Sequence, residues 1–218
     1  MSVHSALLVV YLAVGLLVGL VAHEYAHALV AVRLGDHSPR LQGRLTLNPR
    51  PHIDPFGTIV LPAILLLVVL FDPTKTFVFA YAKPMELNPW ILRRRQAQAL
   101  WIALAGPAAN VLVAFVLGGA YRLVRVSGGE VRTFIGACLL ANVILAAMNL
   151  MPIPPLDGAR IVTLYLPPRP AEVMRNLEQY GALFMIVIFF IISGPIITFA
   201  KAIGNGICQI VVGGRCFL

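Results

Sequence analysis

Charge is scarce in this sequence. Only 12% of its 218 residues are charged, against 59% that are hydrophobic, and just nine residues are acidic. A soluble domain of this length needs far more charge to cover its surface. The scarcity therefore excludes an ordinary soluble protein and indicates a chain that lies within a membrane.

Cysteine is rare, and basic residues are absent from the start of the chain. Cys138, Cys208 and Cys216 form no CxxC pair and lack the spacing of metal ligands. Cys138 lies in an apolar run and is expected in the core, while nothing in the sequence requires a bridge between Cys208 and Cys216. No Lys or Arg precedes Arg33, so the apolar N-terminus lacks the basic region of a signal peptide. It is expected to be a retained first span.

What the sequence does contain is long uncharged runs. Four of them approach or exceed the roughly 20 residues that cross a bilayer: residues 6–22, 99–121, 133–153 and 181–200. They predict helices at about 5–33, 97–124 and 131–151, and a C-terminal hydrophobic region at about 180–212 that Gly194-Pro195 should interrupt.

The fold class that follows is an all-α polytopic membrane protein. We expect a single membrane-embedded domain over residues 1–218, with a three-helix core at about 5–165 and one or more additional C-terminal membrane helices. The Pro-rich stretch 152–155 should break the third helix.

Basic residues predict the orientation, because Lys and Arg collect in cytoplasmic loops. Nine of them lie between residues 33 and 96, and none lies before the first helix. We therefore expect a multi-pass cell-membrane protein whose N-terminus is outside. Residues 57–82 must then dip into the bilayer and return as a re-entrant segment, for which a β-hairpin is one form. The formal charge of +8 needs no nucleic-acid partner on this reading.

The sequence His23-Glu24-Tyr25-Ala26-His27 lies on the first predicted helix. A spacing of four puts both imidazoles on one face, where they can bind a single Zn²⁺. Glu24 lies beside them and can deprotonate a water on the metal. It comes nine residues before Arg33, about 14 Å from the cytoplasmic edge. The alternative is a satisfied core cluster, but such groups are costly in an apolar helix that does not use them.

A catalytic zinc usually has a third protein ligand and keeps the fourth position open. Asp157 is the best candidate because it follows a long apolar helix and a proline break, and Asp54 and His52 are the alternatives. Taken alone, Asp157-Gly158 would be interpreted as an ordinary turn. For Asp157 to reach the histidines at equal depth, the first and third helices must run parallel, which the re-entrant scheme allows.

Three motifs occur in order: HEYAH at 23–27, GPAAN at 106–110 and NLMPIPPLDG at 149–158. Over about residues 15–165 the chain resembles the site-2 protease family of intramembrane metalloproteases. NPRPHIDPFGTIVLP (48–62) and AKPMELNP (82–89) look like the segments that bacterial and archaeal members carry between these motifs. The chain has no room for a PDZ domain between the second and third helices and no tail for a CBS pair.

The resemblance implies an intramembrane zinc endopeptidase that opens toward the cytoplasm. It would hydrolyse peptide bonds in or near the transmembrane segments of single-span membrane proteins. By the same likeness His23, His27 and Asp157 would bind one zinc ion, and Glu24 would be the general base. The alternative function is a non-peptidase membrane protein that binds or transports a divalent metal through the same His/His/Asp site. Such a protein has no evident need for Glu24.

Three further residues are candidates with two interpretations each. The amide of Asn149, eight residues before Asp157, could stabilise an oxyanion or bind the substrate backbone, or form a helix–helix hydrogen bond. Asn110 has the same alternatives, with the bridging role favoured. His52 could face the site from the re-entrant segment, or cap a loop.

Overall fold

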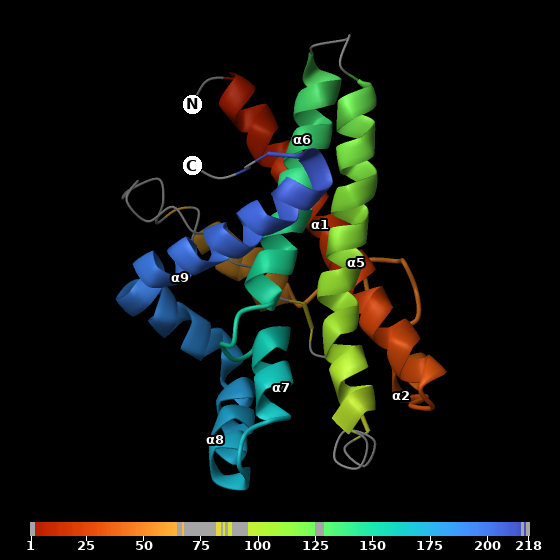
Figure 1. Cartoon of the computed structure of the whole chain (residues 1–218), viewed down its shortest axis with the longest axis vertical. Helices are drawn as coiled ribbons and strands as arrows, with labels where there is room; N and C mark the ends of the chain where they lie inside the picture. The colour runs from red at the N-terminus through yellow and green to blue at the C-terminus, as the bar shows by residue number, and fades with distance from the viewer. Residues whose placement is uncertain are drawn as a thin grey trace.

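The computed structural model describes residues 3–64, 67, 82–83, 85, 87–88, 96–124, 129–214 and 216. Within this part, the side chains of residues 3–6, 179, 182–193 and 196 are not described. The described residues form helices and no strand, which agrees with the predicted all-α fold (Figure 1). Four long helices dominate: α1 (Val3–Arg33), α5 (Gln96–Leu123), α6 (Glu130–Asn149) and α9 (Gly181–Val212).

Three stretches of these helices are long and apolar enough to cross a membrane, namely Leu7–Arg33, Gln96–Leu123 and Glu130–Asn149. They match the three predicted core helices to within a few residues. Short helices that were not predicted lie between the long ones in the described part of the chain. They are α2 (Ser38–Leu41), the π-helix η1 (Pro55–Val60), α7 (Asp157–Thr163) and α8 (Pro168–Gln179).

Helices α1 and α6 pack closely and run parallel. A Cβ at Gly15 would lie 2.7 Å from the Cα of Cys138, and one at Gly19 would lie 2.7 Å from Oδ1 of Asn142. Glycine at these two positions lets the helix backbones approach, as small residues do in membrane helix pairs. The residue numbers of the paired positions increase in the same direction along both helices. The first and third core helices therefore run parallel, as the sequence required.

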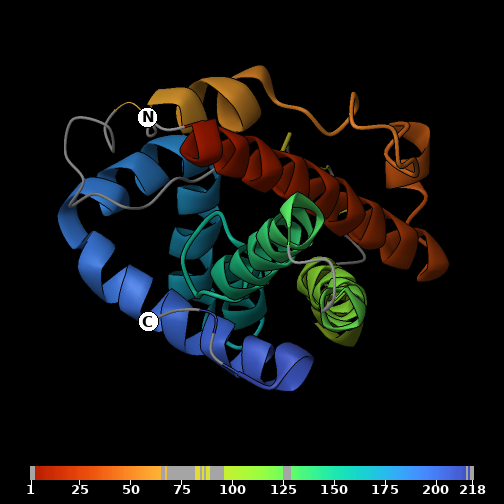
Figure 2. The ribbon, with the colours of Figure 1, turned by 90° about the horizontal axis from the view of Figure 1, so that it is seen from above.

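Helix α5 runs antiparallel to α1. Near one end of the contact, His27 bonds to Ile102, and farther along, Asn110 bonds to Gly19. Along this contact the residue numbers therefore increase in α5 while they decrease in α1. Figure 2 shows α5 and α6 nearly end-on beside α1, which runs across the view, and α9 curves around α6.

Helix α9 differs from its prediction, because it continues through Pro195 without interruption. A proline in a helix removes one hydrogen bond and bends the axis more often than it ends a long apolar helix. The last part of α9 packs on α5 and α6 in a buried cluster that includes Ala114, Val143 and Val211. A disulfide joins Cys208 of this helix to Cys216, with 5.9 Å between their Cα atoms.

Most of the predicted re-entrant segment, residues 57–82, lies outside the described residues. Its described beginning is helical: η1 continues into a helical turn at 61–64, so a β-hairpin does not start here. The backbone N–H of Lys83 donates to the carbonyl of His52 at 3.0 Å. The chain before the segment and the chain after it are therefore neighbours.

Candidate metal centre

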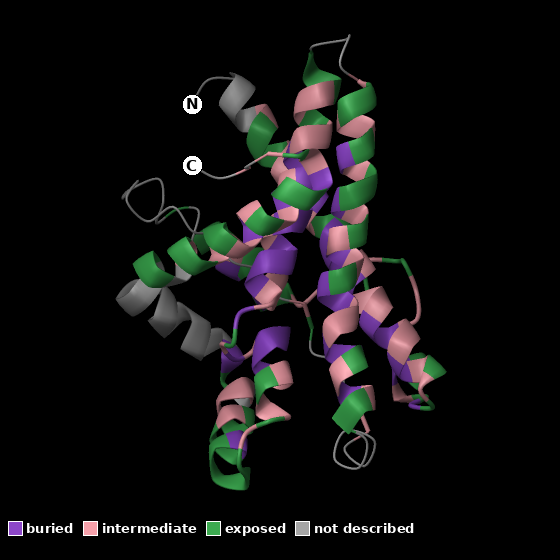
Figure 3. Ribbon diagram, in the orientation of Figure 1, coloured by how far each residue is buried: buried purple, intermediate pink, exposed green. Residues whose placement is uncertain are grey.

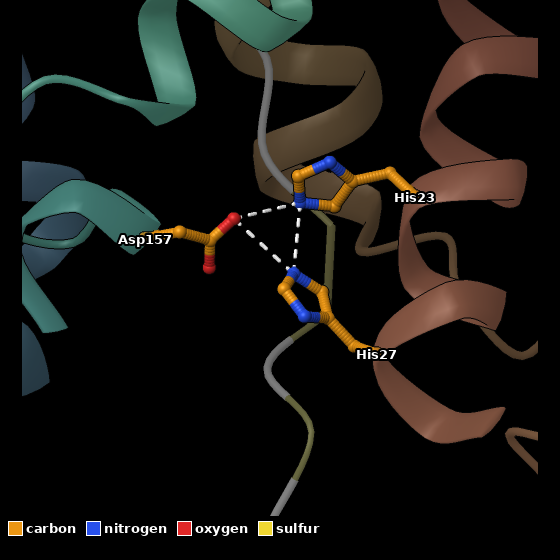
Figure 4. A group of neighbouring side chains, drawn as sticks. All are labelled: His23, His27 and Asp157. Atoms are coloured by element: carbon orange, nitrogen blue, oxygen red, sulfur yellow. Dashed lines mark hydrogen bonds and ion pairs between the residues drawn. The ribbon is translucent and has the colours of Figure 1, made fainter. Parts of the chain in front are cut away.

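His23, His27 and Asp157 meet in the centre of the helical core (Figure 4). The Nε2 atoms of the two histidines are 3.0 Å apart. Oδ2 of Asp157 lies 3.0 Å from Nε2 of His23 and 3.2 Å from Nε2 of His27. Each residue is only 4% exposed. Three donor atoms from α1 and α7 thus face one small volume.

The local sequence explains how Asp157 reaches this place. Helix α6 ends at Asn149, the chain turns through residues 150–156, and Asp157 is the first residue of α7. A Cβ at Gly158 would overlap the carbonyl oxygens of Leu150 and Met151. Glycine at 158 therefore lets α7 begin directly against the turn, which aims the Asp157 carboxylate at α1. The Asp-Gly pair is more than an ordinary turn.

Each imidazole is held through its other nitrogen. Nδ1 of His27 donates to the carbonyl of Ile102 at 2.6 Å, so its Nε2 lone pair faces the centre. Nδ1 of His23 lies 2.7 Å from Oδ1 of Asn110. The amide nitrogen of Asn110 donates to the carbonyl of Gly19 at 2.9 Å, which identifies the atom facing His23 as the oxygen. His23 must therefore carry its proton on Nδ1 and direct its Nε2 lone pair toward Asp157.

Asn110 itself is fixed by a further amide. Its Nδ2 also donates to Oδ1 of Asn142 at 3.2 Å, and Nδ2 of Asn142 donates to the carbonyl of Cys138 at 2.9 Å. Both asparagines are fully buried. A polar chain thus runs from α6 through α5 to His23 in an otherwise apolar interior.

The three donors fit a metal ion of the size and preference of zinc. Tetrahedral zinc with N and O ligands at about 2.0–2.1 Å separates those ligands by about 3.3–3.4 Å, close to the separations found. Two imidazoles and a carboxylate are a common donor set of catalytic zinc. A Cβ at Gly106 would lie 2.5 Å from Nε2 of His23 and would overlap Nε2 of His27. Glycine at 106 keeps open the volume beside both nitrogens that an ion needs.

Two charged residues lie beside the three donors. Glu24 is half-buried and close enough to interact electrostatically with His23 and Arg160. Arg160 of α7 lies with Nη1 3.7 Å from Oδ1 of Asp157, and its Nε donates to Oε1 of Glu178 at 2.6 Å. Burial acts to lower the pKa of Arg160, but the nearby carboxylates, Glu178 foremost, outweigh it and raise that pKa. Arg160 thus stays charged and orients Asp157.

The other sequence candidates make hydrogen bonds within their own segments. Oδ1 of Asp54 accepts from the N–H of Gly57 at 2.7 Å and caps η1. The buried ring of His52 donates from Nε2 to the carbonyl of Thr46 at 2.9 Å, a contact within its own loop. Nδ2 of Asn149 donates to the carbonyl of Leu145 in its own helix at 2.9 Å. None of the three belongs to the group of metal-ligand candidates found in the described part of the chain.

Sequence reasoning missed the roles of Gly106, Asn142 and Arg160. A signal existed for Asn142, which is one of few polar side chains in the run 133–153. Arg160 lies three residues after Asp157 and shares its helix face, but only once α7 is known to be a helix. The contact of Gly106 with the imidazoles depends on the packing of α1 against α5, which no local pattern reveals.

Comparison with known proteins adds independent findings. The model of the family described as Peptidase family M50 matches residues 124–194, a range that includes Asp157. The chain is similar to proteins that bear the name "Putative zinc metalloprotease": YwhC of Bacillus subtilis, and Rip2 of Mycobacterium tuberculosis and of Mycolicibacterium smegmatis. No solved structure matches the chain.

The likeness to YwhC is 35% identity over 187 residues, which cover 82% of this chain and 80% of that protein. For the Rip2 of M. tuberculosis it is 31% over 177 residues, 80% of this chain but only 64% of that protein. The M. smegmatis protein is 29% identical over 180 residues. Ordered motifs, convergent side chains and these relatives agree, and the chain belongs to peptidase family M50, the site-2 protease family that its motifs resemble.

Proposed function

We propose that this chain is an intramembrane zinc endopeptidase, which hydrolyses peptide bonds in or near the transmembrane segments of single-span membrane proteins. One observation carries the proposal. The donors of His23, His27 and Asp157 converge on a volume that Gly106 keeps open, between helices apolar enough to lie in a bilayer. Membership of family M50 supports a metallopeptidase.

In this proposal His23, His27 and Asp157 hold the zinc. The ion supplies Lewis-acid chemistry, polarising a carbonyl and making water acidic enough to serve as a nucleophile near neutral pH. Glu24 takes the proton from the attacking water and passes it to the leaving amine. Asn110 and the Ile102 carbonyl keep the imidazoles in the tautomer that binds metal. Given their observed contacts, Asn149 and His52 are assigned no part in this scheme.

The same proposal includes an orientation, with the N-terminus outside and the site open to the cytoplasm. The basic residues support it, and so does the disulfide. Cys208 packs near the Leu123 end of α5, since Gly118 contacts Val211 and a Cβ at Gly213 would lie 3.3 Å from Arg122. Disulfides persist outside the cytoplasm and are rare within it. Both arguments support an orientation with the Leu123 end of α5 outside.

The re-entrant course of residues 57–82 also remains part of the proposal. A segment that crossed the bilayer once would separate its two ends by about 30 Å. The hydrogen bond from Lys83 to the carbonyl of His52 joins chain on either side of it. The neighbouring ends support a segment that enters the membrane and returns.

The test uses purified full-length protein loaded with zinc and candidate single-span substrates. We expect cleavage that a chelator abolishes and added zinc restores. Glu24→Gln should retain one zinc per chain by elemental analysis while losing turnover by about 10²–10⁴-fold. Glu172→Gln, at an exposed position on α8, is the matched control and should cleave normally. Cleavage that survives in Glu24→Gln, or that ignores zinc removal, would refute the mechanism. Metal transport that Glu24→Gln leaves unchanged would favour the non-peptidase alternative.

A further inference from the structure

A cavity of about 330 Å³ lies beside the metal centre. It is lined by the start of α5, by α7 and α8, and by residues 85 and 87. Figure 1 shows α7, α8 and the start of α5 at the lower end of the view. Two of its lining residues also contact the metal centre. The carbonyl of Ile102 accepts the hydrogen bond from His27, and Arg160 lies 3.7 Å from Asp157. The cavity therefore adjoins the three donors.

One face of α5 connects the cavity with the metal centre. Ala99 and Ala103 line the cavity, and Gly106 touches the imidazoles. These positions are four and three residues apart, so they share a face of the helix. Their side chains are small, so another chain can approach this face closely. A chain that reaches the open volume at Gly106 can continue along this face into the cavity.

The cavity walls are mostly apolar. Met85, Leu87, Ile102 and Leu164 contribute hydrocarbon surface from three parts of the chain. Its volume is at the lower end of the range of about 300–1,000 Å³ for small-molecule sites. It suits one or two side chains of a peptide.

Three charged residues complete the lining: Arg160, Arg175 and Glu178. The first and last neutralise each other, because Nε of Arg160 donates to Oε1 of Glu178 at 2.6 Å. Arg175 is exposed, and among the described residues it has no carboxylate partner. Among the described lining residues, Arg175 is therefore a positive charge without a matching carboxylate, which favours an anionic group.

We propose that this cavity binds the stretch of substrate next to the scissile bond, taking an apolar side chain against its walls and a neighbouring acidic side chain at Arg175. The inference rests on the proposed function and adds a sequence preference to it. A peptide is the favoured occupant because it can reach the metal centre and the cavity at once along α5. A lipid headgroup would satisfy Arg175 alone.

The probes are three short peptides that end in a zinc-binding hydroxamate. Each contains a leucine, which is followed by glutamate in the first, glutamine in the second and lysine in the third. Binding is measured to the zinc-loaded full-length protein in phosphatidylcholine nanodiscs. We expect the glutamate probe to bind about threefold to fivefold more tightly than the glutamine probe, the range of a partly exposed ion pair. Exchanging the leucine for alanine should weaken binding about tenfold or more.

Variants of α8 give the decisive comparison. Arg175→Gln should remove the preference for glutamate, and Arg175→Glu should invert it in favour of lysine. Arg169→Glu makes the same charge change at an exposed position on α8 that does not line the cavity, and it should keep the wild-type preference. Reversal of the preference identifies a specific contact, since a general structural defect would weaken all three probes alike.

The outcomes separate the two proposals. If no probe binds in a zinc-dependent way, the proposed function itself fails. If probes bind but Arg175 variants leave their ranking unchanged, or weaken all of them equally, the cavity assignment is overturned. If phosphatidylglycerol in the nanodiscs abolishes the preference for glutamate, Arg175 binds a lipid phosphate and the peptide assignment is likewise overturned.

Discussion

At the scale of single residues, the metal centre depends on the groups that hydrogen-bond to the ligating side chains as much as on those side chains themselves. Asn110 of α5 is fully buried and bonds to partners on two other helices: His23 and Gly19 on α1, and Asn142 on α6. The sequence suggested a helix bridge for it. The bridge is present, and it also fixes the proton of His23 on Nδ1.

We expect Asn110→Leu to weaken zinc binding by about 10–100-fold, the usual effect of removing the group behind a ligating histidine. Asn110→Asp keeps an acceptor for the His23 proton and should recover part of this loss. Competition with a zinc chelator measures both. Asn149→Ala, whose lost hydrogen bond lies within its own helix, is the control for zinc affinity. Wild-type affinity in Asn110→Leu would reduce Asn110 to a bridge between helices.

Gly106 gives a sharper prediction, because an added methyl group would lie against both Nε2 atoms. Gly106→Ala should abolish stoichiometric zinc binding, as measured by elemental analysis of the purified protein. Gly119→Ala is the matched control: it lies in the same helix, and nothing is within 4 Å of its Cβ position. This control should bind zinc fully and gain up to about 1 kcal/mol in helix propensity. Full zinc occupancy in Gly106→Ala would show that the volume is not needed.

At the scale of elements, Asp36 attaches the chain after α1 to residues 87–88. Its carboxylate accepts from the N–H of Ser38 at 3.0 Å and from the N–H of Asn88 at 2.8 Å. Burial acts to raise its pKa, but these hydrogen bonds outweigh it and lower the pKa below the ordinary value. The folded state thus favours the charged carboxylate.

The attachment should therefore depend on pH. A lowered folded pKa stabilises the fold above the unfolded value of about 3.9, and this stabilisation is lost as the pH falls through the folded value. We expect hydrogen exchange at the Asn88 amide to be slow near pH 7, and Asp36→Asn to accelerate it there. Asp54→Asn makes the same change at the cap of η1 and should leave Asn88 protected. Equal protection in Asp36→Asn and wild type would contradict the attachment.

Sequence patterns predicted some elements and not others for a physical reason. Long apolar runs identify α1, α5 and α6 because a bilayer demands that composition. The short helix α7 has seven residues, and α8 has twelve of mixed polarity, so neither resembles a span. Asp157 was found from its motif, whereas Arg160 and Arg175 needed helices that the sequence did not reveal. The parallel course of α1 and α6 was predictable, because one metal ion had to bind both the histidines of α1 and the aspartate that follows α6.

At the scale of the whole molecule, orientation is the main prediction. In a protein with Cys138 replaced, an engineered cysteine at exposed Val131 should react with a membrane-impermeant thiol reagent from outside intact cells. An engineered cysteine at exposed Leu47 should react only after the cells are opened. The basic loops and the disulfide both favour this result. Labelling of position 47 in intact cells would reverse the orientation and place the metal centre on the other side.

The distance along the chain between the donors has a consequence for biosynthesis. His27 and Asp157 are 130 residues apart, and α5 and α6 lie between them. A nascent chain that has inserted only α1 carries two of the three ligands and lacks the groups of α5 that set their tautomers. Tight metal loading must therefore wait until the ribosome has delivered the end of α6 and the turn beyond it. On the proposed function, the peptidase is therefore made without activity and would cleave neighbouring membrane proteins only once its own insertion is nearly complete.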